Sequence, residues 1–142
     1  MTRPSWDEYF MRIAVETSRR STCPLGHSGA VIVRDKRMLS TGYTGSIAGY
    51  PHCDSKDHRD DICDQVIHAE ANAVIQAARN GVSTEGATIY STSAPCWSCF
   101  KMLSNSGIRS VLYTGDESID KKVLDASERL GLRIEKLILD IH

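Results

Sequence analysis

The sequence has no apolar run long enough to cross a bilayer, no low-complexity tract and no internal repeat. Its longest apolar stretches, such as residues 29–33, are short and interrupted, far below the roughly 20 residues that a transmembrane helix needs. The N-terminus also lacks the apolar core of a signal peptide. We therefore expect no membrane association and a soluble, cytoplasmic protein.

Proline- or glycine-rich linkers are also missing, so the composition suggests no domain boundary. The 142 residues are 41% hydrophobic and 25% charged, which is the usual range for a chain that folds around one core. We expect a single domain over residues 1–142.

An excess of positive charge is absent as well. The chain has 17 Lys and Arg against 18 Asp and Glu, a net charge of −1, and the basic residues are scattered along the sequence. This disfavours a duplex or a long RNA as partner, because such binding depends on clustered basic side chains. A small phosphorylated substrate is compatible with the composition, because one phosphate needs only a few donors.

The cysteine count is odd, which argues against a disulfide framework. There are five cysteines and no secretory signal, so metal ligation or buried thiols are the better interpretations.

Hydrophobic periodicity and turn residues predict helices that alternate with strands. Ser5 and Glu8 have the spacing of a capping box at the start of the first helix. Helices are expected at residues 6–20, 67–80, 96–106 and 120–130, and strands at 29–33, 38–43, 87–92, 110–114 and 132–139. The first two strands form a hairpin and the others are mainly parallel. The predicted fold is α/β, a three-layer α/β/α sandwich around a single mixed sheet of about five strands.

Residues 44–64 have the composition of a loop, rich in Gly, Asp and His. A loop this long is uncommon in a small domain unless it has a function.

Two short motifs at predicted helix starts carry the chemistry. Cys96 and Cys99 are three positions apart, so they share one helix face and can reach one ion. His68 and Glu70 would diverge by about 200° inside a helix, but at its first turn both can lean over the helix end. Two thiolates and one imidazole leave the fourth position of a tetrahedral zinc site open for water, as in catalytic sites.

Glu70 then has a chemical role beside the metal. Zinc lowers the pKa of a bound water towards about 7, and a nearby carboxylate can take up and return protons during hydrolysis. The order His-x-Glu, then Pro-Cys-x-x-Cys, is the signature of zinc deaminases that attack cytosine C4 or adenine C6.

Two alternatives to a catalytic site are a structural zinc site and a redox pair of cysteines. A closed structural site needs a fourth ligand and gives Glu70 no purpose. A Cys-x-x-Cys redox motif explains neither His68 nor Pro95.

At these residues the chain resembles the cytidine deaminase-like superfamily, and more closely the deoxycytidylate (dCMP) deaminases. The resemblance extends over nearly the whole length, and its supporting segments are residues 5–10, 31–38, 42–49, 52–53, 67–73 and 106–108. It implies a five-stranded sheet between helices and the conversion of dCMP to dUMP for thymidylate synthesis. It also implies a homo-oligomer, commonly a hexamer. Many members are activated by dCTP and inhibited by dTTP, and Mg²⁺ would accompany such a bound triphosphate. For a viral member, the location would be the cytoplasm of the host cell.

The resemblance also implies roles for individual residues. His68, Cys96 and Cys99 correspond to the zinc ligands, Glu70 to the proton shuttle, and the backbone amide of Ala69 to a donor facing the pyrimidine carbonyl. Residues expected to contact sugar and phosphate are Arg20, Ser21, Thr44 and Tyr113.

Thr44 marks a departure from the family pattern. The family's Gly-Tyr-Asn-Gly segment reads Gly42-Tyr43-Thr44-Gly45 here, and threonine offers one hydroxyl on a stiff stem where asparagine offers an amide. The sequence therefore leaves open whether the substrate is dCMP alone or also dCTP, and whether the effectors act.

The remaining cysteines allow a second metal site around the long loop. Bacterial and phage-type members often hold a structural zinc there, and Cys23, Cys53, His58 and Cys63 would form a closed tetrahedral set. Buried thiols with solvent-facing histidines are an equally valid interpretation.

Other functions share the zinc motif. The enzyme could deaminate a base in tRNA, which the acidic net charge disfavours, or a nucleoside, free base or pteridine-like ring. A zinc-stabilised scaffold without catalysis would have no need of Glu70.

Overall fold

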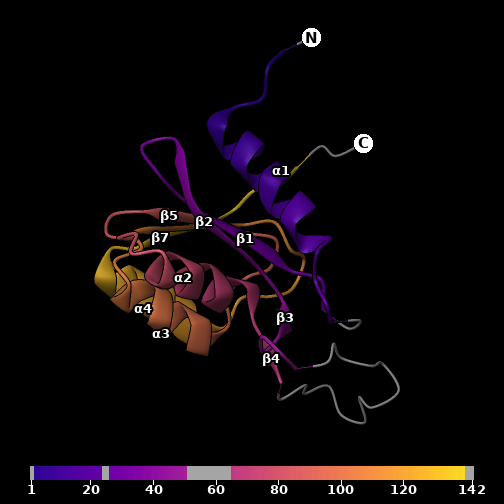
Figure 1. Cartoon of the computed structure of the whole chain (residues 1–142). Coiled ribbons are helices and arrows are strands. Elements are labelled where there is room, and N and C mark those ends of the chain that lie inside the picture. Colours follow the sequence, from indigo (N-terminus) through magenta and orange to yellow (C-terminus); the bar gives the residue numbers. More distant parts are fainter. Residues whose placement is uncertain (1, 24–25, 51–64, 140–142) are drawn as a thin grey trace.

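A five-stranded sheet lies between one helix on one face and three helices on the other (Figure 1). The computed structural model describes residues 2–23, 26–50 and 65–139. The helices are α1 (Trp6–Ser18), α2 (Ala69–Arg79), α3 (Trp97–Asn105) and α4 (Lys121–Leu130). The strands are β1 (Gly29–Arg34), β2 (Arg37–Tyr43), β3 (Gly45–Ser46), β4 (Val66–Ile67), β5 (Thr88–Ser91), β6 (Ser110–Tyr113) and β7 (Arg133–Lys136).

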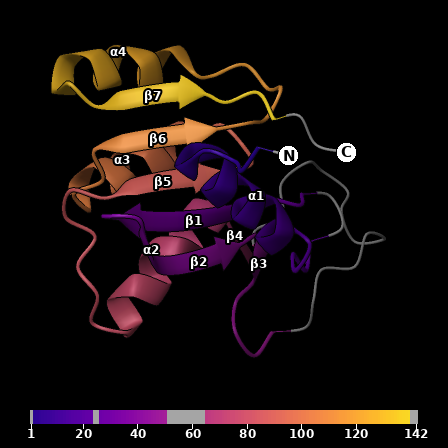
Figure 2. The ribbon, with the colours of Figure 1, turned by 90° about the horizontal axis from the view of Figure 1, so that it is seen from above.

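The main sheet is mixed, with the order β2-β1-β5-β6-β7 (Figure 2). Strand β1 runs antiparallel to both β2 and β5, whereas β5, β6 and β7 are parallel to one another. Helices α3 and α4 supply the crossovers between the parallel strands. The predicted α/β/α sandwich with one hairpin and a five-stranded sheet is therefore confirmed.

Alternation along the strands creates two apolar cores. In β5, Tyr90 packs against α1, and Ile89 packs against α2 and α3. Phe10, Met11 and Ala14 fill the core under α1, and Ala73 and Phe100 contribute to the core under α2 and α3. This period of two directs every second strand residue to the same face of the sheet.

The predicted hairpin is present and has a tight two-residue turn. Asp35 and Lys36 have φ of 52° and 63°, the left-handed backbone that a type I′ turn requires at both central positions. The expected connection of residues 34–37 shortens to these two residues.

The predicted start of α1 is only half of a capping box. The amide of Glu8 donates to Ser5 Oγ at 3.1 Å, as an N-cap requires. The Glu8 carboxylate accepts from Arg12 at 2.6 Å, so it pairs within the helix.

The expected loop from residue 44 begins with a structure that the sequence did not predict. Strands β3 and β4 pair antiparallel, with Gly45 opposite Ile67 and Ser46 opposite Val66. Two-residue strands are too short to produce a periodic pattern.

Within the described ranges, no helix is long and apolar enough to span a membrane.

Candidate active site

Two helix N-termini converge to form the site. His68 is the N-cap of α2 and Cys96 is the N-cap of α3, both with extended backbone. Because His68 precedes the first helical turn, its imidazole is free of the helical spacing that would separate it from Glu70. The side chain of His68 makes no capping hydrogen bond.

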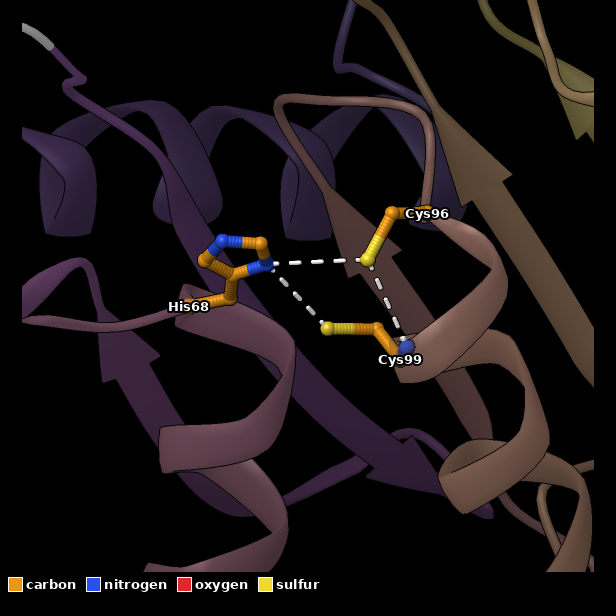
Figure 3. Close-up of side chains that lie close together, drawn as sticks. All are labelled: His68, Cys96 and Cys99. Carbon is orange, nitrogen blue, oxygen red and sulfur yellow. Dashed lines mark hydrogen bonds between the residues drawn. The ribbon is translucent and has the colours of Figure 1, made fainter. Parts of the chain in front are cut away.

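The three predicted ligands point toward one another (Figure 3). His68 Nδ1 lies 3.7 Å from Cys96 Sγ and 3.4 Å from Cys99 Sγ, and all three ligand atoms lie within 4.8 Å of one another. Tetrahedral zinc with its usual bond lengths separates a histidine nitrogen and a cysteine sulfur by about 3.6 Å. The residues thus fit a zinc ion in both chemistry and spacing.

The α3 N-terminus holds the two thiols in place. The amide of Cys99 donates to Cys96 Sγ at 3.5 Å, so Cys96 caps the helix with sulfur. Burial raises the pKa of the Cys99 thiol, and the nearby Glu70 and Cys96 act in the same direction. A metal ion bound to the thiol would reverse this preference, because a coordinating thiol is deprotonated.

Glu70 lies beside the three candidate zinc ligands. Among the described residues, the group that could hold a metal ion consists of His68, Cys96 and Cys99 and does not include Glu70. Glu70 as a whole residue is 4% exposed, and its carboxylate interacts with the Cys99 thiol. Burial raises the pKa of Glu70, while a hydrogen bond from Ser91 and the nearby His68 act in the opposite direction. A buried carboxyl with a raised pKa can hold a proton and release it again, as a proton shuttle must.

The close approach of β2 to α2 positions His68 and Glu70. A Cβ on Gly42 would lie 2.5 Å from the Ala69 carbonyl oxygen, so only glycine allows this contact. The side-chain amide of Asn72 donates to the Tyr43 carbonyl at 2.8 Å, which ties the first turn of α2 to the end of β2. The Gly42-Tyr43 pair therefore supports the start of the helix that carries the site.

Ala69 and Tyr113 lie on the site side of the sheet. Ala69 is fully buried in the first turn of α2, where a backbone amide has no intrahelical acceptor. Tyr113 ends β6 opposite Ser91 of β5, and parallel strands in register point paired side chains to the same face. Both positions are consistent with the expected substrate contacts, which stay predictions.

The other expected substrate contacts lie around the turn after α1. Arg20 is exposed. The Ser21 hydroxyl is engaged with the carbonyls of Gly26 and Thr44, each at 2.8 Å, so it organises the loop. Thr44 is 7% exposed. The structure does not test their contacts with a nucleotide.

For the second metal site, only Cys23 is described, and it is buried. The other three proposed ligands, Cys53, His58 and Cys63, lie outside the described residues, so this site stays a prediction.

Sequence analysis did not identify Ser91 as a site residue. Its side chain is fully buried and its hydroxyl donates to Glu70 Oε1 at 2.9 Å. The available signal was a hydroxyl at the end of a strand whose preceding residues, Ile89 and Tyr90, are apolar or aromatic.

Comparison with known proteins relates this chain to zinc-binding deaminases. The family model described as "Cytidine and deoxycytidylate deaminase zinc-binding region" matches residues 4–114. ComE operon protein 2 of Bacillus subtilis is 44% identical over 142 residues, which cover 99% of this chain and 75% of that protein. The deoxycytidylate deaminase of Mycobacterium phage D29 is 38% identical over 126 residues, which cover 80% of this chain and 97% of that one.

A solved structure extends the similarity to the fold. The dCMP deaminase of cyanophage S-TIM5, crystallised with dCMP and dUMP, superposes with a TM-score of 0.82 at 28% identity. The superposition covers 96% of this chain and all of the phage chain. With the family model over residues 4–114 and a His-Cys-Cys group beside a buried glutamate, the chain belongs to the cytidine and deoxycytidylate deaminase family.

Proposed function

We propose that this chain is a zinc-dependent hydrolase that converts dCMP and water to dUMP and ammonia. The observation that carries the proposal is the convergence of His68, Cys96 and Cys99 from two helix starts, with the buried Glu70 beside them. The similarity to deoxycytidylate deaminases over nearly the whole chain supports dCMP as the substrate. The product would supply thymidylate synthesis.

His68, Cys96 and Cys99 hold the zinc ion in this proposal. A zinc ion held by these residues would supply hydroxide at neutral pH as the nucleophile for attack on cytosine C4. Glu70 takes one proton from the attacking water and delivers it to the ring nitrogen. It then takes the second proton from the oxygen added at C4 and delivers it to the amine, which leaves as ammonia while the C4 carbonyl forms. The net change at C4 is loss of the amine and gain of a carbonyl oxygen.

The surrounding residues bind and orient the base. The Ala69 amide, at the first turn of α2, donates to the pyrimidine carbonyl. Tyr113, on the site face of the sheet, contacts the nucleotide, and Arg20, Ser21 and Thr44 are the further candidates for sugar and phosphate contacts. The buried setting of Glu70 keeps bulk water away from the proton transfers.

A cavity beside β2 and α2 supports regulation by a nucleotide effector. It has a volume of about 580 Å³ and lies between α2 and the Gly42–Gly45 region, a size in the usual range of small-ligand sites. Arg79 on its wall offers a cation for a phosphate. We expect dCTP, with Mg²⁺, or dTTP to act here.

The same face supports assembly of several copies. Ile47, Tyr50 and Ile75 line this cavity and are exposed, and apolar side chains gathered in this way are typical of interaction sites. We expect a homo-oligomer, with a hexamer as the leading expectation, located in the cytoplasm of a cell or of a viral host.

A substrate panel tests the proposed function. The purified protein is assayed for ammonia release from dCMP, dCTP, deoxycytidine and tRNA, and dCTP or dTTP is added as effector where it is not the substrate. Fastest turnover of dCMP is expected. Turnover of tRNA or of deoxycytidine with little on dCMP would contradict the assigned substrate.

A further inference from the structure

Ser91 places a hydroxyl in a part of the sheet that is otherwise apolar. It ends β5 and is fully buried. Ile89, two residues earlier on the same face, packs in the core with Ala73 and Phe100. A hydroxyl buried among such neighbours costs free energy unless it is hydrogen-bonded. The hydrogen bond to Glu70 therefore explains why a hydroxyl is tolerated at this buried position.

The hydrogen bonds of Ser91 have a fixed direction. The amide of Ser93 donates to Ser91 Oγ at 3.3 Å, and an amide can only donate. The hydroxyl accepts there, and it donates its own hydrogen to Glu70 Oε1 at 2.9 Å, because an ionised carboxylate can only accept. Ser91 thus acts as an oriented donor to one oxygen of the buried carboxylate.

The backbone around Ser91 holds this donor still. Ser91 pairs with Ala30 of β1 on one side and with Tyr113 of β6 on the other. Its carbonyl also accepts from the Thr114 amide at 3.2 Å. A strand fixed on both sides is a more exact support than a loop.

We propose that Ser91 is a positioning residue for the deamination, whose hydroxyl holds the Glu70 carboxylate in the orientation required for proton transfer. This inference rests on the proposed function of Glu70 as proton shuttle. Proton transfer needs the carboxylate within hydrogen-bond reach of the proton it takes, and small displacements of a catalytic group lower the rate strongly. Without the hydroxyl, Glu70 Oε1 loses its donor from β5, and the carboxylate can turn about the contacts that remain, such as that with the Cys99 thiol.

The test compares kcat with KM in variants at position 91. Ser91→Ala should lower kcat by about 10-fold or more, the usual effect of removing a partner that orients a site residue. The zinc content should stay at the wild-type value, because Ser91 contacts none of the three ligands, and KM should change much less than kcat, because the expected sugar and phosphate contacts lie on other residues. Ser91→Thr, which keeps the hydroxyl, should recover most of the lost kcat.

A matched control comes from α4. Ser127 is also buried, and its hydroxyl donates to the Leu124 carbonyl at 2.8 Å, away from Glu70. Ser127→Ala makes the same chemical change and should leave kcat at the wild-type value. A merely structural role for Ser91 would make Ser91→Ala behave like Ser127→Ala, with lower stability and an unchanged kcat per folded, zinc-loaded molecule, and this result would overturn the inference.

Failure of the proposed function gives a different result. It would appear as no ammonia release by the wild-type protein from any cytosine substrate in the panel. In that case crystal structures of the wild-type protein and Ser91→Ala decide the matter. A Glu70 carboxylate that keeps its orientation without the hydroxyl would overturn the inference, and one that rotates away would support it.

Discussion

Gly42 of β2 lies directly against Ala73 of α2, so close that a Cβ on Gly42 would come 2.3 Å from the Ala73 backbone nitrogen. Gly42 immediately precedes Tyr43, whose carbonyl accepts from Asn72. The contact holds β2 against α2, the helix that has His68 as its N-cap and carries Glu70 in its first turn. The packing of a strand on a helix therefore sets the position of two site residues.

Gly42→Ala should separate β2 from α2. The new Cβ would meet backbone atoms, which cannot move aside like a flexible side chain, and we expect the free energy of unfolding to fall by about 3 kcal/mol. Urea denaturation measures this change. Gly26→Ala is the control, because a Cβ there meets nothing within 4 Å. Equal stability of the two variants would contradict the close packing.

The stability of the protein should fall at high pH through Tyr90. Its hydroxyl donates to Asp7 Oδ1 at 2.6 Å, and burial with the nearby Asp7 carboxylate raises the pKa of Tyr90. The unfolded tyrosine ionises near pH 10, so the unfolded state loses its proton first and stability falls as the pH rises above about 10.

Tyr90→Phe tests this dependence. The variant should be less stable at neutral pH by about 2 kcal/mol, the usual loss for a hydrogen bond to a charged group, and should lose less additional stability above pH 10. Tyr9→Phe, at an exposed position, should retain the wild-type pH dependence. Parallel pH profiles for Tyr90→Phe and wild type would contradict the assignment.

Zinc content tests the second metal site. Purified wild-type protein should contain two zinc ions per chain, and replacement of Cys53 and Cys63 together by serine should leave one. Cys96→Ser should also leave one, because it removes the His68, Cys96 and Cys99 site instead. Elemental analysis of protein from which weakly bound metal has been removed gives the number of zinc ions per chain. A wild-type content of one zinc would remove the second site.

Much of the architecture could be predicted because its signals are local. The helix starts at Trp6, Ala69, Trp97 and Lys121 lie within two residues of the predicted starts, since caps and apolar periodicity act over a few residues. The His68, Cys96 and Cys99 group also follows from local order, because each motif lies at the start of its own helix.

The unpredicted features depend on contacts between distant segments. Ser91 and Glu70 are 21 positions apart, and no spacing rule relates a strand end to a helix start. The approach of Gly42 to Ala73 likewise depends on how β2 packs on α2. The β3–β4 pair is too short to have a period. These are tertiary contacts, and the sequence shows only residue types compatible with them.

The central claim is that Glu70 moves the protons at a site whose metal is held by His68, Cys96 and Cys99. Glu70→Gln keeps the shape of the side chain and removes its capacity to take up a proton, so dCMP turnover is the most direct measurement. The account predicts that the wild-type protein converts dCMP to dUMP, whereas Glu70→Gln retains its zinc and shows no measurable conversion. Undiminished conversion by a zinc-loaded Glu70→Gln protein would contradict it.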